Sequence, residues 1–385
     1  MTLWLVTIKL FLALRESYDI SKSTLPNFAG SFRICSLRVS AAFSSIRFDV
    51  SSDRSLSPEG KSLTSFTPYI ASLPNLFAIF ALVSVAIAAE PEPSVPQKTE
   101  TASVERLGEE ATSTLYQAYE YDRTIPLESR VVEEIKKDGT VRQKIVFRGV
   151  QGFLVPSYLE YPAEGKSPFP CVLLLHGWSG AKEHWWKDGG YISGGNVRQA
   201  LLKTGFAVMA LDAQCHGDRI AQNDFAPVNH FVDPALEKHP RKGYFTQRDI
   251  YIQTTRDYRR AIDYLETRSE IIASRIGAIG YSMGGAQTFL LTGVDDRVKV
   301  SVACCTPADR IKTSPIAPQN FTRGLGNRPF LMIMGRTDEM CSMELANGLH
   351  VLIESTAKEL IMIDAGHKLP VDYVPRAIEW IQKHL

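Results

Sequence analysis

A serine, an aspartate and a histidine follow one another along the chain as Ser282, Asp338 and His367. Each comes just after a run of apolar residues that is typical of a buried strand. The carboxyl ends of parallel strands meet at one edge of a sheet, so we expect these side chains to lie together. A serine hydroxyl beside an imidazole that a carboxylate orients can attack an acyl carbon. The spacing therefore predicts a Ser-His-Asp triad.

The serine lies in the motif Gly280-Tyr281-Ser282-Met283-Gly284-Gly285, between an apolar run and the helix-compatible residues 286–292. The glycines on either side of the serine fit this sharp turn, because a strand cannot pass so abruptly into a helix if bulky side chains crowd it. The motif is common by chance, and it gains weight here because the other members of the triad follow in order.

Two backbone N–H groups are candidates for an oxyanion hole. The apolar residues 171–175 end in His176-Gly177-Trp178, and the N–H of Trp178 is predicted to lie beside that of Met283. We expect Trp185 and Trp186 to bind substrate as a hydrophobic wall, and ordinary aromatic packing is the alternative.

Glu339 and Asp364 compete with Asp338 for the role of the acid. Asp338 is preferred because it comes just past the apolar run 330–335, where a carboxylate can meet an imidazole N–H. Asp364 is only three residues before His367 and is better suited to capping that loop.

Strands and helices alternate through most of the chain, which predicts an α/β fold. An antiparallel hairpin around Asp138-Gly139 precedes a mostly parallel sheet with helices on both faces. The predicted strands are 130–135, 141–148, 152–161, 169–176, 206–212, 275–281, 298–304, 330–335 and 358–363. The predicted helices are 196–204, 248–267, 286–292, 342–354 and 371–385.

Residues from about 130 to 385 resemble the α/β-hydrolases of the dienelactone hydrolase and acetyl-xylan-esterase-like group. The matching segments are His176-Gly177-Trp178-Ser179-Gly180, Asp212-Ala213-Gln214-Cys215-His216-Gly217, Gly280-Tyr281-Ser282-Met283-Gly284-Gly285, Gly335-Arg336-Thr337-Asp338 and Gly366-His367. The resemblance implies the α/β-hydrolase fold and an acyl-enzyme mechanism. Dienelactone hydrolases have a cysteine nucleophile where this chain has Ser282, so the resemblance implies ester hydrolysis more than dienelactone chemistry.

A hydrolase of carboxylic esters is therefore the expected function, with small acyl esters or acetylated polysaccharide as candidate substrates. A peptidase of the prolyl-oligopeptidase type shares this kind of catalytic domain, but the chain lacks room for the propeller of that family. A catalytically silent binding protein is the third hypothesis, and the filled triad positions count against it.

The formal net charge of the 385 residues is +1, and residues 90–385 hold 35 basic and 37 acidic side chains. No basic stripe occurs there, so we expect no nucleic-acid partner. The triad needs no metal and no cofactor. The six cysteines are irregularly spaced and are expected to be buried thiols, although a bridge from Cys304 or Cys305 to Cys341 stays open.

Residues 1–89 have the character of a leader. Serine accounts for 14 of the first 70 residues, and the apolar run 76–89 ends in the small-residue pattern Ala86-Ile87-Ala88. We expect a start assigned too far upstream of a signal peptide, and hence an exported protein with no stable membrane span after cleavage. An organelle-targeting leader and an uncleaved anchor are the alternatives.

The domain is predicted to be 113–385, after a flexible linker at 90–112. Residues 217–247 lack a clear period and are predicted to form a lid over the serine. The histidines and aspartates of this insert lack the spacing of a metal site, and we expect solvated loop residues.

The leader hypothesis predicts that the exported protein begins at Ala89 or Glu90, because signal peptidase recognises small residues at positions 86 and 88. N-terminal sequencing of the mature protein measures this directly. A protein that keeps residue 1 in its native compartment would contradict export.

Overall fold

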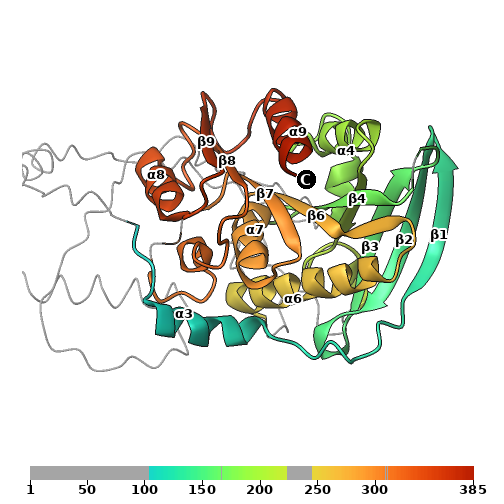
Figure 1. Ribbon diagram of the computed structural model, residues 1–385, viewed down its shortest axis with the longest axis horizontal. Coiled ribbons are helices and arrows are strands. Elements are labelled where there is room, and N and C mark those ends of the chain that lie inside the picture. The colour runs from blue at the N-terminus through green and yellow to red at the C-terminus, as the bar shows by residue number, and fades with distance from the viewer. Residues whose placement is uncertain (1–103, 166, 223–244, 308, 310) are drawn as a thin grey trace, which may run out of the picture. The chain divides into compact units, whose positions relative to one another are not determined.

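A nine-stranded sheet in the order β1-β2-β3-β5-β4-β6-β7-β8-β9 forms the centre of the structure (Figure 1). The computed structural model describes residues 104–165, 167–222, 245–307, 309 and 311–385, which belong to one unit, Pro93–Leu385. The strands are β1 Arg130–Lys137, β2 Thr140–Arg148, β3 Leu154–Pro162, β4 Phe169–Leu175, β5 Ala207–Leu211, β6 Ile271–Tyr281, β7 Val298–Cys304, β8 Phe330–Gly335 and β9 Lys358–Ile363.

Strands β4 to β9 run parallel, and β1, β2 and β3 pair antiparallel at one side of the sheet. Asp138 and Gly139 join β1 to β2 with φ values of 53° and 73°, the left-handed conformation that a two-residue hairpin requires. Strand β4 lies between β5 and β6, so the order of the strands reverses beside it. Parallel sheets bind ligands at such a reversal. The predicted fold class is confirmed.

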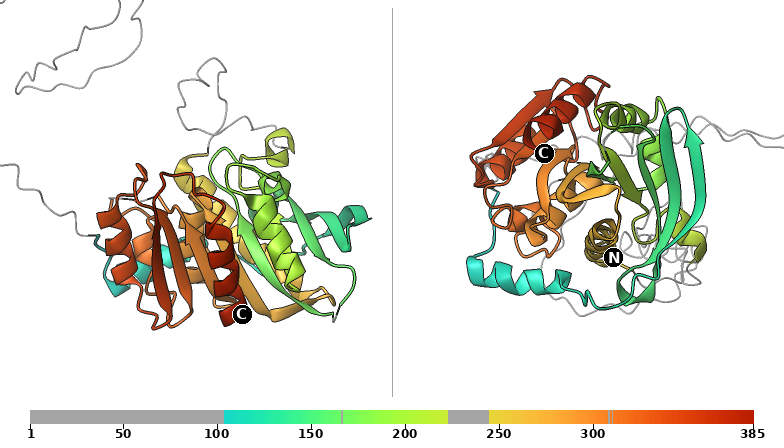
Figure 2. Two further views of the ribbon diagram at one scale, coloured as in Figure 1. Left: turned by 90° about the horizontal axis from the view of Figure 1, so that it is seen from above. Right: turned by 45° about the vertical axis from the view of Figure 1, so that its right-hand side comes forward.

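Helices cover both faces of the sheet (Figure 2). Helices α4 Gly194–Lys203 and α9 Tyr373–His384 pack on one face, and α6 Gln247–Glu266 and α7 Met283–Val294 pack on the other. Helix α8 Met343–Leu352 packs in the same cluster as α7. Two shorter helices are α3 Glu109–Tyr116 and α5 Asp218–Gln222.

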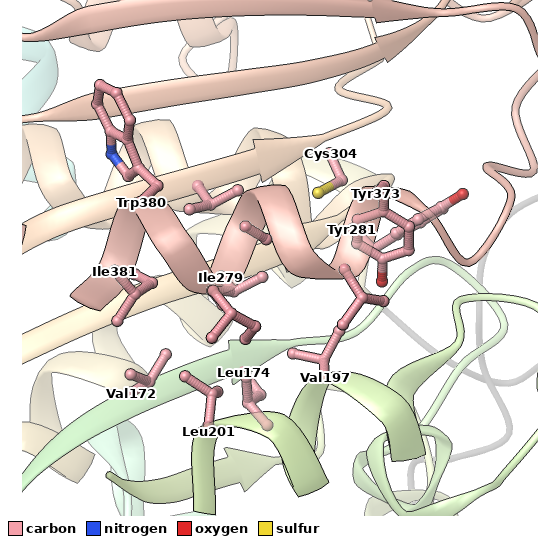
Figure 3. Close-up of a cluster of buried hydrophobic side chains, with 14 of the residues drawn as sticks. Val172, Leu174, Val197, Leu201, Ile279, Tyr281, Cys304, Tyr373, Trp380 and Ile381 are labelled. Carbon is pink, nitrogen blue, oxygen red and sulfur yellow. The ribbon is translucent and has the colours of Figure 1, made fainter. Parts of the chain in front are cut away.

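Alternate residues of the central strands enter separate cores. Val172 and Leu174 of β4 pack beneath α4 and α9 (Figure 3), whereas Leu173 and Leu175 pack against the α6 side. All four side chains are fully buried. A strand buried on both faces has no polar side to alternate with, which explains its continuous apolar run. The two cores hold the carboxyl ends of the strands in fixed positions.

The predicted flexible linker at 90–112 is wrong over residues 104–112, because these residues contact the domain. The Arg106 guanidinium donates to Thr322 Oγ1 and forms an ion pair with Glu354 at 2.6 Å. The N–H of Leu107 donates to Asn320 Oδ1 at 2.9 Å. Val104 packs against the core beside α8, but polar contacts supply most of the attachment, so the composition of this segment resembled a linker.

The predicted lid at 217–247 lies mostly outside the described residues. Its first residues form α5, where Arg219 is buried and pairs with Asp257 of α6 at 2.6 Å. Its end enters α6, whose first turn is capped by reciprocal hydrogen bonds between Thr246 and Asp249. The lid therefore stays a prediction for residues 223–244.

The predicted leader, 1–89, is also outside the described residues, and its cleavage stays a prediction. Among the helices that the structure describes, none is long and apolar enough to cross a membrane.

Candidate active site

Ser282 occupies a strained turn between β6 and α7. Its φ and ψ are 57° and −117°, a conformation that a residue with a side chain adopts only at a cost. The turn is held from both sides, because the N–H of Ser282 donates to Cys304 O and its carbonyl accepts from Ala286 N–H. The hydroxyl therefore stands at the edge of the sheet at the first turn of a helix.

Close backbone contacts around this turn require glycine. A Cβ atom on Gly284 would lie 2.0 Å from Leu175 O, and one on Gly280 would lie 2.0 Å from Gly284 O. Both distances are far inside van der Waals contact, as the motif predicted. Gly177 lies against the serine as well, since its Cβ would be 3.3 Å from Ser282 Cβ. The loop after β4 therefore touches the serine directly.

Ser282, His367 and Asp338 form a continuous row of hydrogen bonds. Ser282 Oγ lies 2.8 Å from His367 Nε2, and His367 Nδ1 lies 2.9 Å from Asp338 Oδ2. The Asp338 side chain is fully buried, and that of His367 is 21% exposed. Asp338 Oδ1 also accepts from Met340 N–H at 2.8 Å, which holds the carboxylate in place. The three residues that the sequence selected are thus brought together.

Asp338 and His367 follow the adjacent strands β8 and β9, and the loops after these strands are joined by hydrogen bonds. The N–H of Arg336 donates to Ile363 O at 2.8 Å, and that of Thr337 donates to Ala365 O at 3.0 Å. Asp364, the competing acid, instead forms an ion pair with Arg336 at 2.7 Å and is exposed. The partner of His367 Nδ1 is Asp338 and not Asp364.

Tyr281, immediately before the serine, holds the loop that carries His367. Its hydroxyl donates to His367 O and accepts from Leu369 N–H, both at 2.8 Å. The ring is buried in the core beneath α9, so it is a rigid support (Figure 3). Sequence reasoning missed this residue, because nothing in the motif shows where a phenol will bond.

The loop after β4 is attached to the loop after β5 through His176. Burial lowers the pKa of His176 to about 4, so its ring is neutral. Its Nδ1 donates to Gly177 O at 2.8 Å, and its Nε2 accepts from Ala213 N–H at 3.0 Å. These bonds orient the backbone next to Trp178, whose half-buried ring packs edge-on against His216 at 5.2 Å.

A buried lysine reinforces the same connection, and the sequence carried no signal for it. Lys182 is completely buried, and its ammonium contacts Asp212 at 2.8 Å and Asp218 at 2.9 Å. Burial alone lowers the pKa of Lys182, but the pull of Asp212 and the neighbouring carboxylates outweighs it and the pKa lies above its usual value. The loops after β4 and β5 are therefore held together by an ion pair, Lys182–Asp212, whose two side chains are fully buried.

The predicted substrate wall is wrong for Trp185 and stays a prediction for Trp186. Trp185 is completely buried in the core with α4 and has no surface to offer. Trp186 donates its indole N–H to Glu160 and packs against Tyr158, beside a cavity next to the β1–β2 hairpin. Both rings lie in a short helical turn, Lys182–Trp186. The alternative, ordinary aromatic packing, describes Trp185.

The cysteines of the described residues are free and buried. Cys304 and Cys305 therefore form no bridge to Cys341, and burial raises the pKa of Cys341 to about 12. The expectation of buried apolar thiols is confirmed for this part of the chain.

A family model described as "Alpha/beta hydrolase family" matches residues 172–372, more than half of the chain. The chain belongs to the alpha/beta hydrolase family. The match begins in β4 and ends just before α9, so it contains every residue of the hydrogen-bonded row.

Individual relatives agree with the predicted group. The provisionally named hydrolase YtaP of Bacillus subtilis is 27% identical over 234 residues, covering 55% of this chain and 72% of YtaP. A provisionally named carboxymethylenebutenolidase of Methylorubrum extorquens is 23% identical over 231 residues, covering 59% of this chain and 72% of its own. Acetyl xylan esterase 1 from a Thermoanaerobacterium species has a similar fold, with a TM-score of 0.58 and 16% identity, covering 73% of this chain and 96% of that one.

Lys182→Met should lower the free energy of unfolding by about 3 to 5 kcal/mol, because it leaves Asp212 buried without its cation. Lys187→Met in the same segment is the matched control, since Lys187 is exposed and should cost little. Urea titrations of both variants measure the difference. Equal stabilities would show that the buried contact does not hold the loops.

Proposed function

We propose that this chain is an exported serine esterase that cleaves carboxylic esters through an acyl-enzyme intermediate. The observation that carries the proposal is the unbroken row Asp338–His367–Ser282, with a serine on a strained turn whose hydroxyl is 2.8 Å from an imidazole nitrogen. A strained serine persists only where the surrounding structure holds it, and such strain gathers at functional sites. The match to a hydrolase family supports the same reading.

In the first half-reaction, His367 Nε2 takes the proton of Ser282 as Oγ attacks the ester carbonyl. Asp338 accepts the hydrogen bond from Nδ1–H and stabilises the imidazolium that forms. The carbonyl oxygen becomes an oxyanion, for which the N–H groups of Met283 and Trp178 are the proposed donors. Met283 is the first residue of α7, and Gly177, beside Trp178, lies against the serine.

Collapse of the tetrahedral intermediate breaks the bond to the alcohol, which leaves with the proton from His367. The acyl group remains on Ser282 Oγ. Water then attacks the acyl-enzyme while His367 accepts its proton, and the acid is released with the serine restored. Apart from this water, every group used in the two half-reactions belongs to the chain or to the ester.

A sugar on the alcohol side is the substrate class we favour. Tyr191 is 51% exposed, and its ring stands edge-on to that of Tyr281 with a centroid separation of 6.4 Å. Lys368, adjacent to His367, places its ammonium 5.8 Å from the Tyr191 ring. An exposed ring with a polar neighbour beside the base suits the apolar face and the hydroxyls of a sugar. The acetyl xylan esterase among the structural neighbours is in keeping with this choice.

Ester hydrolysis is distinguished from the other hypotheses by three substrates. The protein from residue 90 onward should hydrolyse a short-chain nitrophenyl ester and acetylated xylan and leave a prolyl amide intact. Cleavage of the amide alone would favour a peptidase. Loss of all three reactions in a folded protein would favour a binding role.

Ser282→Ala should lower kcat for nitrophenyl acetate roughly 10⁴-fold or more, because the triad acts as a unit. Asp338→Asn should lower kcat by up to about 10⁴-fold, since the amide favours the wrong imidazole tautomer. Asp364→Asn is the control for the acid and should stay near the parent. The assignment fails if the serine variant retains activity within tenfold, or if the change at Asp364 is the more harmful.

Tyr281→Phe tests the support of the base. It removes the hydroxyl that bonds His367 O and Leu369 N–H, so the imidazole should shift relative to Ser282. We expect kcat to fall about 10- to 100-fold with little change in KM, because small displacements of a catalytic group are costly. The pH dependence of kcat should shift as well, which a purely structural role would not cause. Unchanged kcat would remove Tyr281 from the positioning of the base.

Tyr191→Ala should lower kcat/KM for acetylated xylo-oligosaccharides about tenfold, the effect of losing roughly 1.4 kcal/mol of ring contact. Nitrophenyl acetate, which has no sugar, should be hydrolysed as before. Tyr191→Phe keeps the ring and is the matched control. An equal loss of kcat/KM on both substrates would show that Tyr191 does not recognise the sugar.

A further inference from the structure

Cys305, at the end of β7, lies beside the acid and the base of the proposed triad. Its Sγ, a carboxylate oxygen of Asp338 and a ring nitrogen of His367 all lie within 4.8 Å of one another. Among the described residues this is the group of metal-binding side chains that the structure brings together. The mechanism above uses Asp338 and His367 but gives Cys305 no part.

The thiol is held in place by its surroundings. Cys305 is fully buried with a φ of 46°, and its N–H donates to Ile333 O at 2.9 Å. Its Sγ lies 3.7 Å from the hydroxyl of Tyr281, the residue that supports the base. The sulfur is therefore kept beside the carboxylate and the imidazole by two independent contacts.

Left alone, this thiol is neutral. Burial raises the pKa of Cys305 to about 12, so it is neither a nucleophile nor a charged partner near neutral pH. A coordinated cation changes this balance, because it removes the proton from a thiol that binds it. One thiolate and one carboxylate then cancel the charge of a divalent ion, so the complete site is neutral and suited to a buried position.

The mixture of ligands selects the type of cation. Sulfur, imidazole nitrogen and carboxylate oxygen together are the set that Zn²⁺ and similar thiophilic ions prefer. Mg²⁺ and Ca²⁺ favour sites made of oxygen alone. The side chain of His367 is partly exposed, so the group borders on solvent.

We propose that Cys305, Asp338 and His367 form an inhibitory site for a thiophilic divalent cation such as Zn²⁺. This regulation rests on the proposed function of the same histidine. Binding places the ion on His367 Nδ1, in place of the hydrogen bond to Asp338. The ring proton moves to Nε2, which then donates to Ser282 and can no longer accept its proton. The thiol proton is released to solvent, and Zn²⁺ keeps its oxidation state.

The first test follows inhibition in the mature protein. Zn²⁺ should inhibit hydrolysis of nitrophenyl acetate, EDTA should restore it, and Mg²⁺ should have no effect at the same concentration. The activity of each variant is expressed relative to its own metal-free rate. For Cys305→Ala, the Zn²⁺ concentration that gives half inhibition should be at least about 100-fold higher than for the parent. Cys341→Ala is the matched control, because Cys341 is also a buried thiol but lies outside the group, and it should respond as the parent does.

The second test measures the metal contact without activity. Cd²⁺ added to the Ser282→Ala variant should produce the ultraviolet absorption of a cadmium–thiolate bond. The double variant with Ser282→Ala and Cys305→Ala should not show this absorption. Cys305→Ser serves if the alanine variant does not fold. The proposal is overturned if inhibition or the absorption band persists without the Cys305 thiol. If the absorption band is present but the parent protein has no esterase activity, the metal site is supported and the proposed function is rejected.

Discussion

The site depends on a steric constraint at the junction of β6 and α7. Ser282 adopts a left-handed conformation there, and the chain can hold it only because Gly280 and Gly284 admit backbone oxygens within 2.0 Å of where a Cβ would stand. The last residues of β6 and nearly all of α7 are buried, and Ser282 is the residue of this junction with a positive φ. Every other element of the site is positioned relative to this turn.

Two further devices bring the remaining loops to the serine. On one side, Lys182 and the neutral His176 bind the loop after β4 to that after β5, and this places Gly177 against Ser282. On the other side, Tyr281 bonds the loop of His367 from below. The first device is a buried charge contact and the second a pair of phenol hydrogen bonds, so removing either leaves polar groups unpaired inside the protein.

The same construction underlies the proposed inhibition by a metal ion. The residue that supports the base also contacts the sulfur of Cys305, which lies among the groups that orient the imidazole. A buried, protonated thiol does not attack an ester, but it is a strong metal ligand once a cation replaces its proton. In the proposed regulation, the geometry that keeps the imidazole ready for proton transfer also completes a site for a soft metal ion.

The sequence by itself determined which residues form the proposed triad and which apolar runs they follow. Continuous apolar runs, each ending in a distinctive residue, were enough to select Ser282, Asp338 and His367 and to prefer Asp338 over Asp364, since local periodicity and the ends of strands are written in short segments. Only the tertiary structure decided the contacts of Trp185, Tyr281, Lys182 and Cys305. The contacts that a side chain makes across the fold depend on the packing of distant elements, and the residues next to it in the sequence do not determine them.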